Sequence, residues 1–191
     1  IESGSIQING TDISDMTQYN LRELMGFVPQ KAVLFSGTIR DNMQYGKPDA
    51  TDEMIWKALE IAQAKDFVSE MEDGLDSHVE QGGGNFSGGQ RQRLAIARAL
   101  VKTADIYVID DSFSALDFKT DANLRQALKT NMKESITVLV AQRVSTVMDA
   151  DMILVLDEGK LVGKGTHEEL LATNETYQEI VHSQLREEDL A

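Results

Sequence analysis

The chain has 191 residues, 18 of them basic and 32 acidic, giving a formal net charge of −14, and it contains no cysteine. The lack of cysteine excludes disulfides and thiolate metal sites. The acidic balance argues against non-specific binding to nucleic acid or anionic lipid, which requires a positive face. This length suits one domain with a substantial core, or one domain with an inserted lobe.

The first 45 residues predict short strands around a short helix. Residues 5–8 and 25–28 are β-like, residues 19–24 are helical, and Asn9-Gly10 is a turn signal. The chain opens without Met, inside what reads as a pair of strands. We therefore expect it to be a piece cut from a longer polypeptide.

From about residue 46 to residue 102 the pattern is helical. Thr51 starts a helix whose next two residues are acidic, which suits the positive end of the helix dipole. Ile55, Leu59 and Ala62 then recur at the spacing of one helix face. The stretch EQGGGNFSGGQ, residues 80–90, is too rich in glycine for the interior of a helix or strand. It leads directly into another helical pattern, so a glycine-rich loop precedes a helix N-terminus.

After residue 103 the predicted strands and helices alternate. DIYVID and ITVLVA predict buried strands with a helix at residues 119–132 between them. Residues 151–165 predict a β-hairpin, and Thr166 with Glu169 a capping box before an acidic helix. Nearly continuous apolar strands alternating with helices are typical of an α/β fold with a largely parallel sheet. No apolar run approaches the ~20 residues of a membrane-spanning helix, so we expect no membrane insertion by these residues.

Residues 86–90, FSGGQ, have the composition of an anion site. The amides of Gly88 and Gly89 and the Ser87 hydroxyl stand at a helix start, where the dipole favours negative charge. A glycine-rich helix start without a ligand fits the same residues equally well.

Two polar residues end apolar strands. Asp110 stands where α/β proteins place their sites and where nucleotide hydrolases hold Mg²⁺, although an Asp that caps the following turn gives the same pattern. Gln30 has a carbonyl oxygen that could hold Mg²⁺ or an attacking water, and its alternative is a residue of a surface loop.

The order and spacing of these segments resemble the nucleotide-binding domain of ABC transporters, over essentially all 191 residues. The exporters of multidrug and lipid-flippase type are the most similar. FVPQ resembles the Q-loop, FSGGQRQR the signature motif, VIDD the Walker B segment, SALD the D-loop and VLVAQRVST the switch segment. LFSGTIRDN resembles the exporter segment that faces the coupling helices of the membrane domains.

The resemblance implies an incomplete P-loop NTPase (ABC ATPase) fold with an inserted helical subdomain, and ATP and Mg²⁺ as cofactors. Residues 1–45 would be part of the core lobe with the Q-loop, residues 46–102 the helical subdomain with the signature, and residues 103–191 the rest of the core lobe. The implied partners are a second nucleotide-binding domain, which joins head to tail, and the membrane domains of the same transporter. The implied location is the cytoplasmic side of the plasma or inner membrane.

The family also implies roles for single residues. Asp110 and Gln30 would hold Mg²⁺, and Gln30 would also sense the γ-phosphate. Asp111, Gln142 and Gln30 occupy the catalytic positions. Two groups would act across the dimer. The signature residues, which would bind the ATP of the partner, are Ser87, Gly88, Gly89 and Gln90. The D-loop residues, which would communicate with the partner, are Ser114, Ala115, Leu116 and Asp117.

The sequence departs from the family in three places. No GxxxxGK[ST] occurs, so we expect the phosphate-cradling loop upstream and no ATPase activity from this chain alone. Asp111 stands where Glu is usual and is shorter by roughly 1.5 Å. Gln142 stands where His is usual and cannot become cationic. Together these changes resemble the degenerate-site subunit of a heterodimeric exporter.

Three alternatives remain. A homodimeric exporter could tolerate Asp111 and Gln142, and a non-catalytic regulatory subunit could use ATP structurally. Soluble ABC ATPases that act on DNA share the signature, but they lack the LFSGTIRDN segment and the charge of −14 suits DNA poorly. The transported substrate is not readable, because selectivity lies in membrane domains.

Overall fold

The computed structural model describes residues 3–113 and 115–188, the last four by their backbone only. The chain forms two compact units, Ile1–Val140 and Ala141–Ala191, and each is described by itself.

The first unit contains most of the regular structure. Its strands are β1 (Gln7–Ile8), β2 (Thr11–Asp12), β3 (Met25–Val28), β4 (Gly37–Thr38), β5 (His78–Val79), β6 (Ile106–Asp110) and β7 (Ile136–Val140). Its α-helices are α1 (Gln18–Glu23), α2 (Ile39–Gly46), α3 (Asp52–Ile61), α4 (Lys65–Ser69), α5 (Gly88–Leu100) and α6 (Phe118–Asn131). Short 3₁₀ turns cover Ile13–Asp15, Gly74–Asp76 and Gln81–Gly83.

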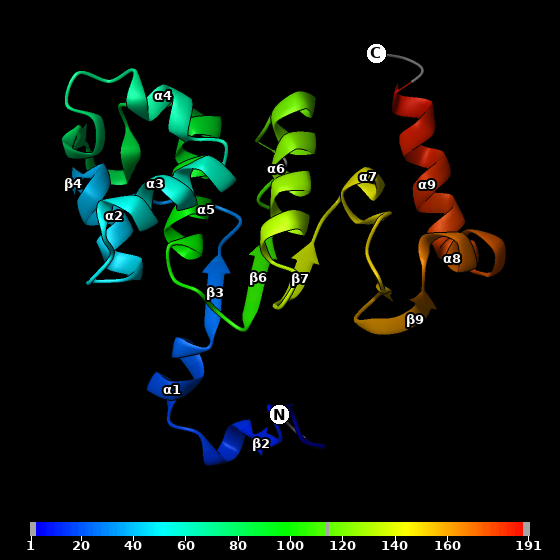
Figure 1. Cartoon of the computed structure of the whole chain (residues 1–191). Helices are drawn as coiled ribbons and strands as arrows, with labels where there is room; N and C mark the ends of the chain where they lie inside the picture. The colour runs from blue at the N-terminus through cyan, green and yellow to red at the C-terminus, as the bar shows by residue number, and fades with distance from the viewer. Residues whose placement is uncertain (1–2, 114, 189–191) are drawn as a thin grey trace. The chain divides into compact units, whose positions relative to one another are not determined.

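A three-stranded parallel sheet in the order β3-β6-β7 lies at the centre of this unit. Its strands point the same way in Figure 1, and α1 with the β1–β2 hairpin lies off the amino end of β3. The hairpin turns at Asn9 and Gly10, which both have positive φ (51° and 80°), as a two-residue type I′ turn requires. The parallel arrangement and the Asn-Gly turn confirm two predictions from the sequence.

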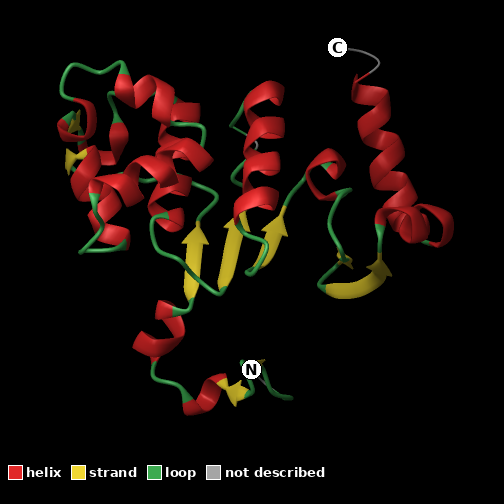
Figure 2. Cartoon of the chain, viewed as in Figure 1, coloured by secondary structure: helices red, strands yellow, loops and turns green. Residues whose placement is uncertain are grey.

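Residues 39–100 are mainly helical, and Figure 2 shows their helices in red. The face of α3 predicted to be apolar is fully buried at Ile55, Leu59 and Ala62. Helicity begins earlier than the expected residue 46, because Thr38 and Asp41 form a capping box that starts α2 at Ile39. The capping box starts the helix even though Gly37, a residue that disfavours helix, comes directly before Thr38.

Strand β7 exists as predicted, but the expectation that it is buried is wrong. Ile136, Val138 and Val140 are all exposed. Among the described residues β7 pairs only with β6. Its apolar sequence therefore does not mean that the strand is buried. Apolar composition alone does not distinguish a central strand from the last strand of a sheet.

The second unit contains α7 (Val144–Val147), β8 (Ile153–Asp157), β9 (Lys160–Gly165), α8 (His167–Thr173) and α9 (Glu175–Glu188). Strands β8 and β9 form the predicted antiparallel hairpin, and Thr166 and Glu169 form the predicted capping box. A small apolar cluster holds the unit together through Ile153, Val155, Leu170, Tyr177 and Val181.

In the part of the chain that the structure covers, no helix has both the length and the apolar character needed to cross a bilayer.

Candidate functional site

The parallel pairing of β3 and β6 brings two predicted site residues together. Val28 is in register with Ile109, so the residues that follow both strands leave the sheet at the same edge. Gln30 donates from Nε2 to Oδ2 of Asp111 at 3.1 Å. The contact joins positions 81 residues apart, and the sequence gives no direct sign of it.

Asp111 has an unusual backbone conformation. Its φ is +39°, a left-handed value that costs an ordinary residue about 1 kcal/mol and that Asp and Asn tolerate best. Its N–H donates to the Val140 carbonyl at 2.7 Å, and only 8% of the residue is exposed. The left-handed turn breaks the alternation of the strand at Asp111, whose carboxylate accepts from Gln30, two residues after β3.

Ser112 holds the same junction and was missed from the sequence. This buried residue donates from Oγ to the carbonyl of Asp110 at 2.9 Å, and Pro29 O lies 3.2 Å from the same hydroxyl. A serine after two carboxylates carries no signal of its own, since one of its partners, the Pro29 carbonyl, lies 83 residues away in the sequence.

The oxygen atoms at this edge suit Mg²⁺. Asp110 is half-buried at the end of β6. The Nε2 group of Gln30 donates to Asp111, so the Oε1 atom is the one left for a cation. Mg²⁺ prefers carboxylate and amide oxygens and keeps several waters, so it needs only one or two protein ligands. The described residues contain no cluster of three acidic, cysteine or histidine ligands.

The signature residues start α5 through a capping box. Ser87 Oγ accepts from Gln90 N at 3.2 Å, and Gln90 Oε1 accepts from Ser87 N at 2.9 Å. The first intrahelical bond runs from Arg91 N to Ser87 O. Gly88 and Gly89 therefore have amides without an intrahelical acceptor. The N-terminus of α5 has the free N–H groups and the dipole that an anion site needs.

The residues after β6 lie beside this helix start. A Cβ placed on Gly89 would lie 3.4 Å from the Ala115 carbonyl oxygen and 3.8 Å from Leu116 Cδ2. The structure thus brings the signature and D-loop segments of one chain together. Leu116 is buried, and Ser114 lies outside the described residues.

Asp117 caps α6. Its Oδ1 accepts from Thr120 N at 2.9 Å, and this backbone hydrogen bond holds the pKa of the Asp117 carboxyl below its usual value. The carboxylate is therefore engaged within its own helix.

Arg93 ties the signature helix to its neighbours. It donates from Nη1 to Gln63 O at 2.6 Å and from Nε to Gly89 O at 3.3 Å, and it lies 4.8 Å from the centre of the Phe67 ring. Burial lowers the pKa of Arg93, while Asp117 opposes that shift. This arginine was not singled out from the sequence.

Gln142 belongs to the second unit. Its side chain is exposed, and its carbonyl accepts from Gln184 Nε2 at 2.6 Å. Its catalytic role stays a prediction.

A comparison with family models matches residues 1–114 to the ABC transporter model. The chain belongs to the ABC transporter family. The curated relatives of this ABC transporter chain include an uncharacterized ABC transporter ATP-binding protein of Mycobacterium tuberculosis, 46% identical over 187 residues. An ATP-dependent lipid A-core flippase of Desulfotalea psychrophila is 42% identical over 184 residues. A multidrug resistance ABC transporter ATP-binding and permease protein of Lactococcus lactis is 41% identical over 184 residues.

Each of these alignments covers 96% of this chain but only 31–32% of the relative, so the chain spans about a third of their length. A solved structure of a bacterial Atm1-family ABC exporter with ATP bound gives a TM-score of 0.91 at 39% identity. It covers 96% of this chain and 32% of that one. The α/β ABC ATPase fold, with a parallel sheet core and helices, is therefore confirmed.

The segment after Gln30 carries a second feature of this ABC transporter chain, which we call the aromatic surface: Val33, Phe35, Tyr45 and Arg98. The Phe35 and Tyr45 rings lie 4.4 Å apart between centroids, and both are exposed. Arg98 lies 5.1 Å from the Phe35 ring and donates from Nη2 to Val33 O at 2.9 Å. Its Nη1 is buried and has no hydrogen-bond partner in the described part of the chain. Exposed aromatic side chains with a polar group, such as Tyr45, are enriched at interaction surfaces.

Asn42 supports this surface from below. It is buried, accepts from Phe35 N at 2.9 Å and donates to Phe35 O at 2.8 Å. The sequence predicts a contact for the LFSGTIRDN segment as a whole, but it does not identify Tyr45, Arg98 or Asn42 as parts of one surface.

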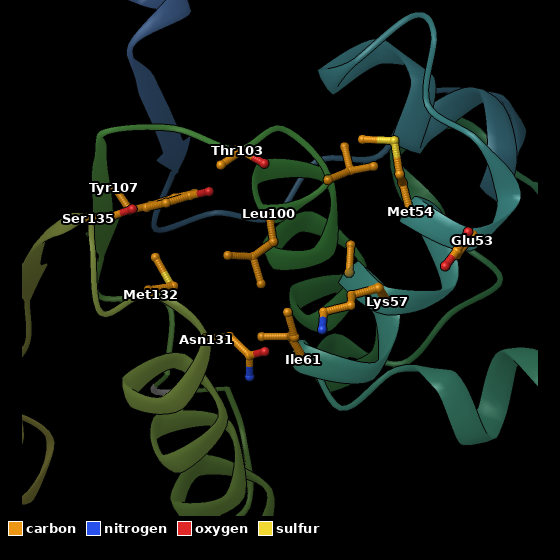
Figure 3. Close-up of a pocket in the computed structure, with 12 residues that line it drawn as sticks. Glu53, Met54, Lys57, Ile61, Leu100, Thr103, Tyr107, Asn131, Met132 and Ser135 are labelled. Atoms are coloured by element: carbon orange, nitrogen blue, oxygen red, sulfur yellow. The ribbon is translucent and has the colours of Figure 1, made fainter.

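A pocket of about 550 Å³ opens between α3, α5, α6 and β6 (Figure 3). Leu100, Met132 and Ile61 supply apolar walls, with Lys57 and Asn131 near them. None of the predicted site residues lines this pocket, so its size does not mark the nucleotide site.

Proposed function

We propose that this chain is the ATP-binding part of an ABC exporter and that, within the whole protein, it powers export of a drug- or lipid-like substrate. The N-terminus of α5 carries the proposal, because Gly88 and Gly89 present unpaired amides beside the Ser87 hydroxyl. The similarity to the flippase, the multidrug protein and the ATP-bound exporter supports the choice of ligand.

Each group of residues has a proposed task. Asp110 and Gln30 hold Mg²⁺, which neutralises phosphate charge when it is bound. Ser87 and Gly89 donate to the γ-phosphate of ATP held by a partner domain, with Gly88 and Gln90 shaping the helix start. The D-loop, Ser114 to Asp117, contacts that partner. Because the chain contains no GxxxxGK[ST], we expect no ATP hydrolysis from these residues alone.

The proposed division of labour follows the sequence. Residues 1–45 carry the Q-loop part of the core, residues 46–102 the helical subdomain with the signature, and residues 103–191 the remaining core. The packing of α5 against both α2 and α3 supports a helical subdomain.

The aromatic surface is the proposed contact with the membrane domains of the transporter. Phe35 of the LFSGTIRDN segment lies at its centre, between Tyr45 and Arg98. The exposed Phe35 and Tyr45 rings suit a partner that brings apolar side chains. This contact would hold the chain on the cytoplasmic side of the plasma or inner membrane.

We further propose that the site formed with Asp111 and Gln142 hydrolyses ATP slowly and that the chain pairs with a non-identical domain. Asp111 is buried and bonded to Gln30, which suits it poorly to reach a water. Gln142 lacks the cationic form that His provides. The intact signature would complete a competent site on the partner.

The test is the full-length transporter carrying Asp111→Glu together with Gln142→His. We expect the steady-state ATPase rate of this site to rise roughly tenfold or more, because a well-placed base contributes about 10²–10⁴-fold. Trapping of nucleotide at each site, with a hydrolysis-deficient partner as the background, separates the two rates. A wild-type site that already hydrolyses as fast as the partner's site would exclude the slow-site role, and a homodimer would remain.

A further inference from the structure

Gln30 belongs to a segment whose successive residues are held by different elements. Gly82 N donates to the Leu34 carbonyl at 3.0 Å, and Arg98 holds the Val33 carbonyl. Gln30 itself is held through its side chain, by the hydrogen bond from Nε2 to Asp111. Lys31, which follows it, is exposed. Next to it, the Pro29 carbonyl lies 3.2 Å from Ser112 Oγ. The Gln30 side chain thus adds the attachment by which the start of this segment is held to the carboxylate that follows β6.

Asp111 is built to make that bond. Its left-handed φ turns the carboxylate away from the direction that strand alternation gives, and its N–H is fixed by the Val140 carbonyl. A strained backbone that persists at a site indicates a functional constraint. A hydrogen bond to a carboxylate is also stronger than one between neutral groups. The strain and the bond serve the same end, which is to fix the amide of Gln30.

The orientation of that amide follows directly. An amide has one donor end and one acceptor end. When Nε2 is bonded to Asp111, Oε1 must point elsewhere, and only Oε1 can hold a cation.

We propose that Asp111 is a positioning residue, whose carboxylate fixes the Gln30 amide with its oxygen toward the metal, and not the base that activates water. The proposal rests on the proposed function for its catalytic meaning. The mechanical part, that Asp111 holds Gln30, applies without nucleotide and is tested separately.

The mechanical test is limited trypsin digestion of the full-length protein in the absence of nucleotide. Cleavage after Lys31 reports how often the segment opens, and cleavage after the exposed Lys160, in the hairpin of the second unit, serves as the internal reference. Asp111→Gly removes the carboxylate while suiting the positive φ, and Asp111→Asn keeps both an acceptor oxygen and tolerance of that φ. We expect Asp111→Gly to speed cleavage after Lys31 about tenfold, as the loss of one hydrogen bond to a charged group implies, and Asp111→Asn to stay close to wild type.

Gln30→Ala provides the same test from the other side of the bond and alters an exposed residue, so it guards against misfolding of the Asp111 variants. It should speed cleavage as much as Asp111→Gly, and the double variant should be no faster than either single one. Unchanged cleavage in both single variants, or additive effects in the double variant, would overturn the proposal.

The catalytic test compares ATPase rates and Mg²⁺-dependent nucleotide affinity in the same proteins. A positioning role predicts that Asp111→Asn retains the Mg²⁺-dependent gain in nucleotide affinity and that Asp111→Gly and Gln30→Ala lose it together. If Asp111→Asn is as inactive as Asp111→Gly while its trypsin pattern is normal, then Asp111 acts as a base and the proposal fails. A protein that shows the protease pattern but no ATP binding at all would instead refute the proposed function.

Discussion

The edge of the sheet and the start of α5 are both predicted to face phosphate, yet they are prepared for it in different ways. At the edge of the sheet the polar groups already bond to each other, since Gln30 donates to Asp111 and Ser112 to neighbouring carbonyls. At the start of α5, Ser87 and Gln90 are paired with each other, and the amides of Gly88 and Gly89 have no intrahelical acceptor among the described residues.

The difference shows which side chains are already oriented by hydrogen bonds within this chain before a ligand binds. The sheet edge orders its groups before any ligand arrives, so changes there should alter orientation and metal dependence. The start of α5 leaves its donors for a ligand, so changes there should alter binding to a phosphate supplied from outside. Variants at the start of α5, where donors are open, should test this contrast most strongly, and variants of groups bonded within the chain should test it least.

Ser87→Ala should have the largest effect. It removes a hydroxyl beside the open amides, and we expect the ATPase rate at the partner's site to fall about 10²-fold, the loss typical of one donor to a developing oxyanion. The measurement is ATP turnover by the full-length transporter, with nucleotide binding at each site followed separately. The chain's own site should retain its nucleotide affinity.

The matched control is Thr166→Ala. Thr166 closes the same kind of capping box on α8 as Ser87 closes on α5, so both variants lose a cap worth about 1 kcal/mol. Equal loss of ATPase activity in the two variants would mean that Ser87 matters only as a cap.

Tyr45→Ala should have a smaller effect on a different step. Tyr45 is 71% exposed, with its ring 4.4 Å from that of Phe35 between centroids, so its removal should leave the domain folded. We expect stimulation of ATPase activity by transported substrate to fall roughly tenfold, as for an aromatic hot spot at an interface. Tyr19→Ala is the matched control, because Tyr19 is 72% exposed but lies on α1. Equal stimulation in both variants would argue against docking at the aromatic surface.

Most of the secondary structure could be predicted from signals within a few residues of each element. Strand β3 has the predicted bounds, and Thr51 caps α3 as its sequence indicates. The order of the motifs identified the family, and FSGGQ was placed correctly at a helix start. These features depend on neighbours within a few residues, which the sequence shows directly.

Features that depend on pairing between distant segments were not predictable. The Gln30–Asp111 bond needs the register of β3 against β6, and the left-handed φ of Asp111 has no signal beyond the tolerance of Asp for it. The exposure of β7 depends on which strands lie beside it and not on its own apolar residues. Whether Asp111 and Gln142 act together also involves two separate units.

The smallest expected effect concerns Asp117, the last D-loop residue, whose carboxylate is bonded within its own helix. Its pKa lies below the usual value, chiefly because Thr120 N donates to the carboxylate. A lowered folded-state pKa means that the ionised cap stabilises α6 above the unfolded pKa of about 3.9, and that this stabilisation is lost as pH falls through the folded value. Asp117→Asn retains an acceptor that does not titrate.

Hydrogen exchange at the Thr120 amide measures this directly. Relative to Asp117→Asn at the same pH, exchange in the wild type should speed up as pH falls below about 4 and should not change between pH 5 and 7. The cap of α1 is the internal control, because Thr17 accepts from Asn20 N at 3.1 Å without a titrating group. If Thr120 and Asn20 respond to acid alike, the cause is general loosening of the domain, and the carboxylate of Asp117 does not hold the end of the D-loop.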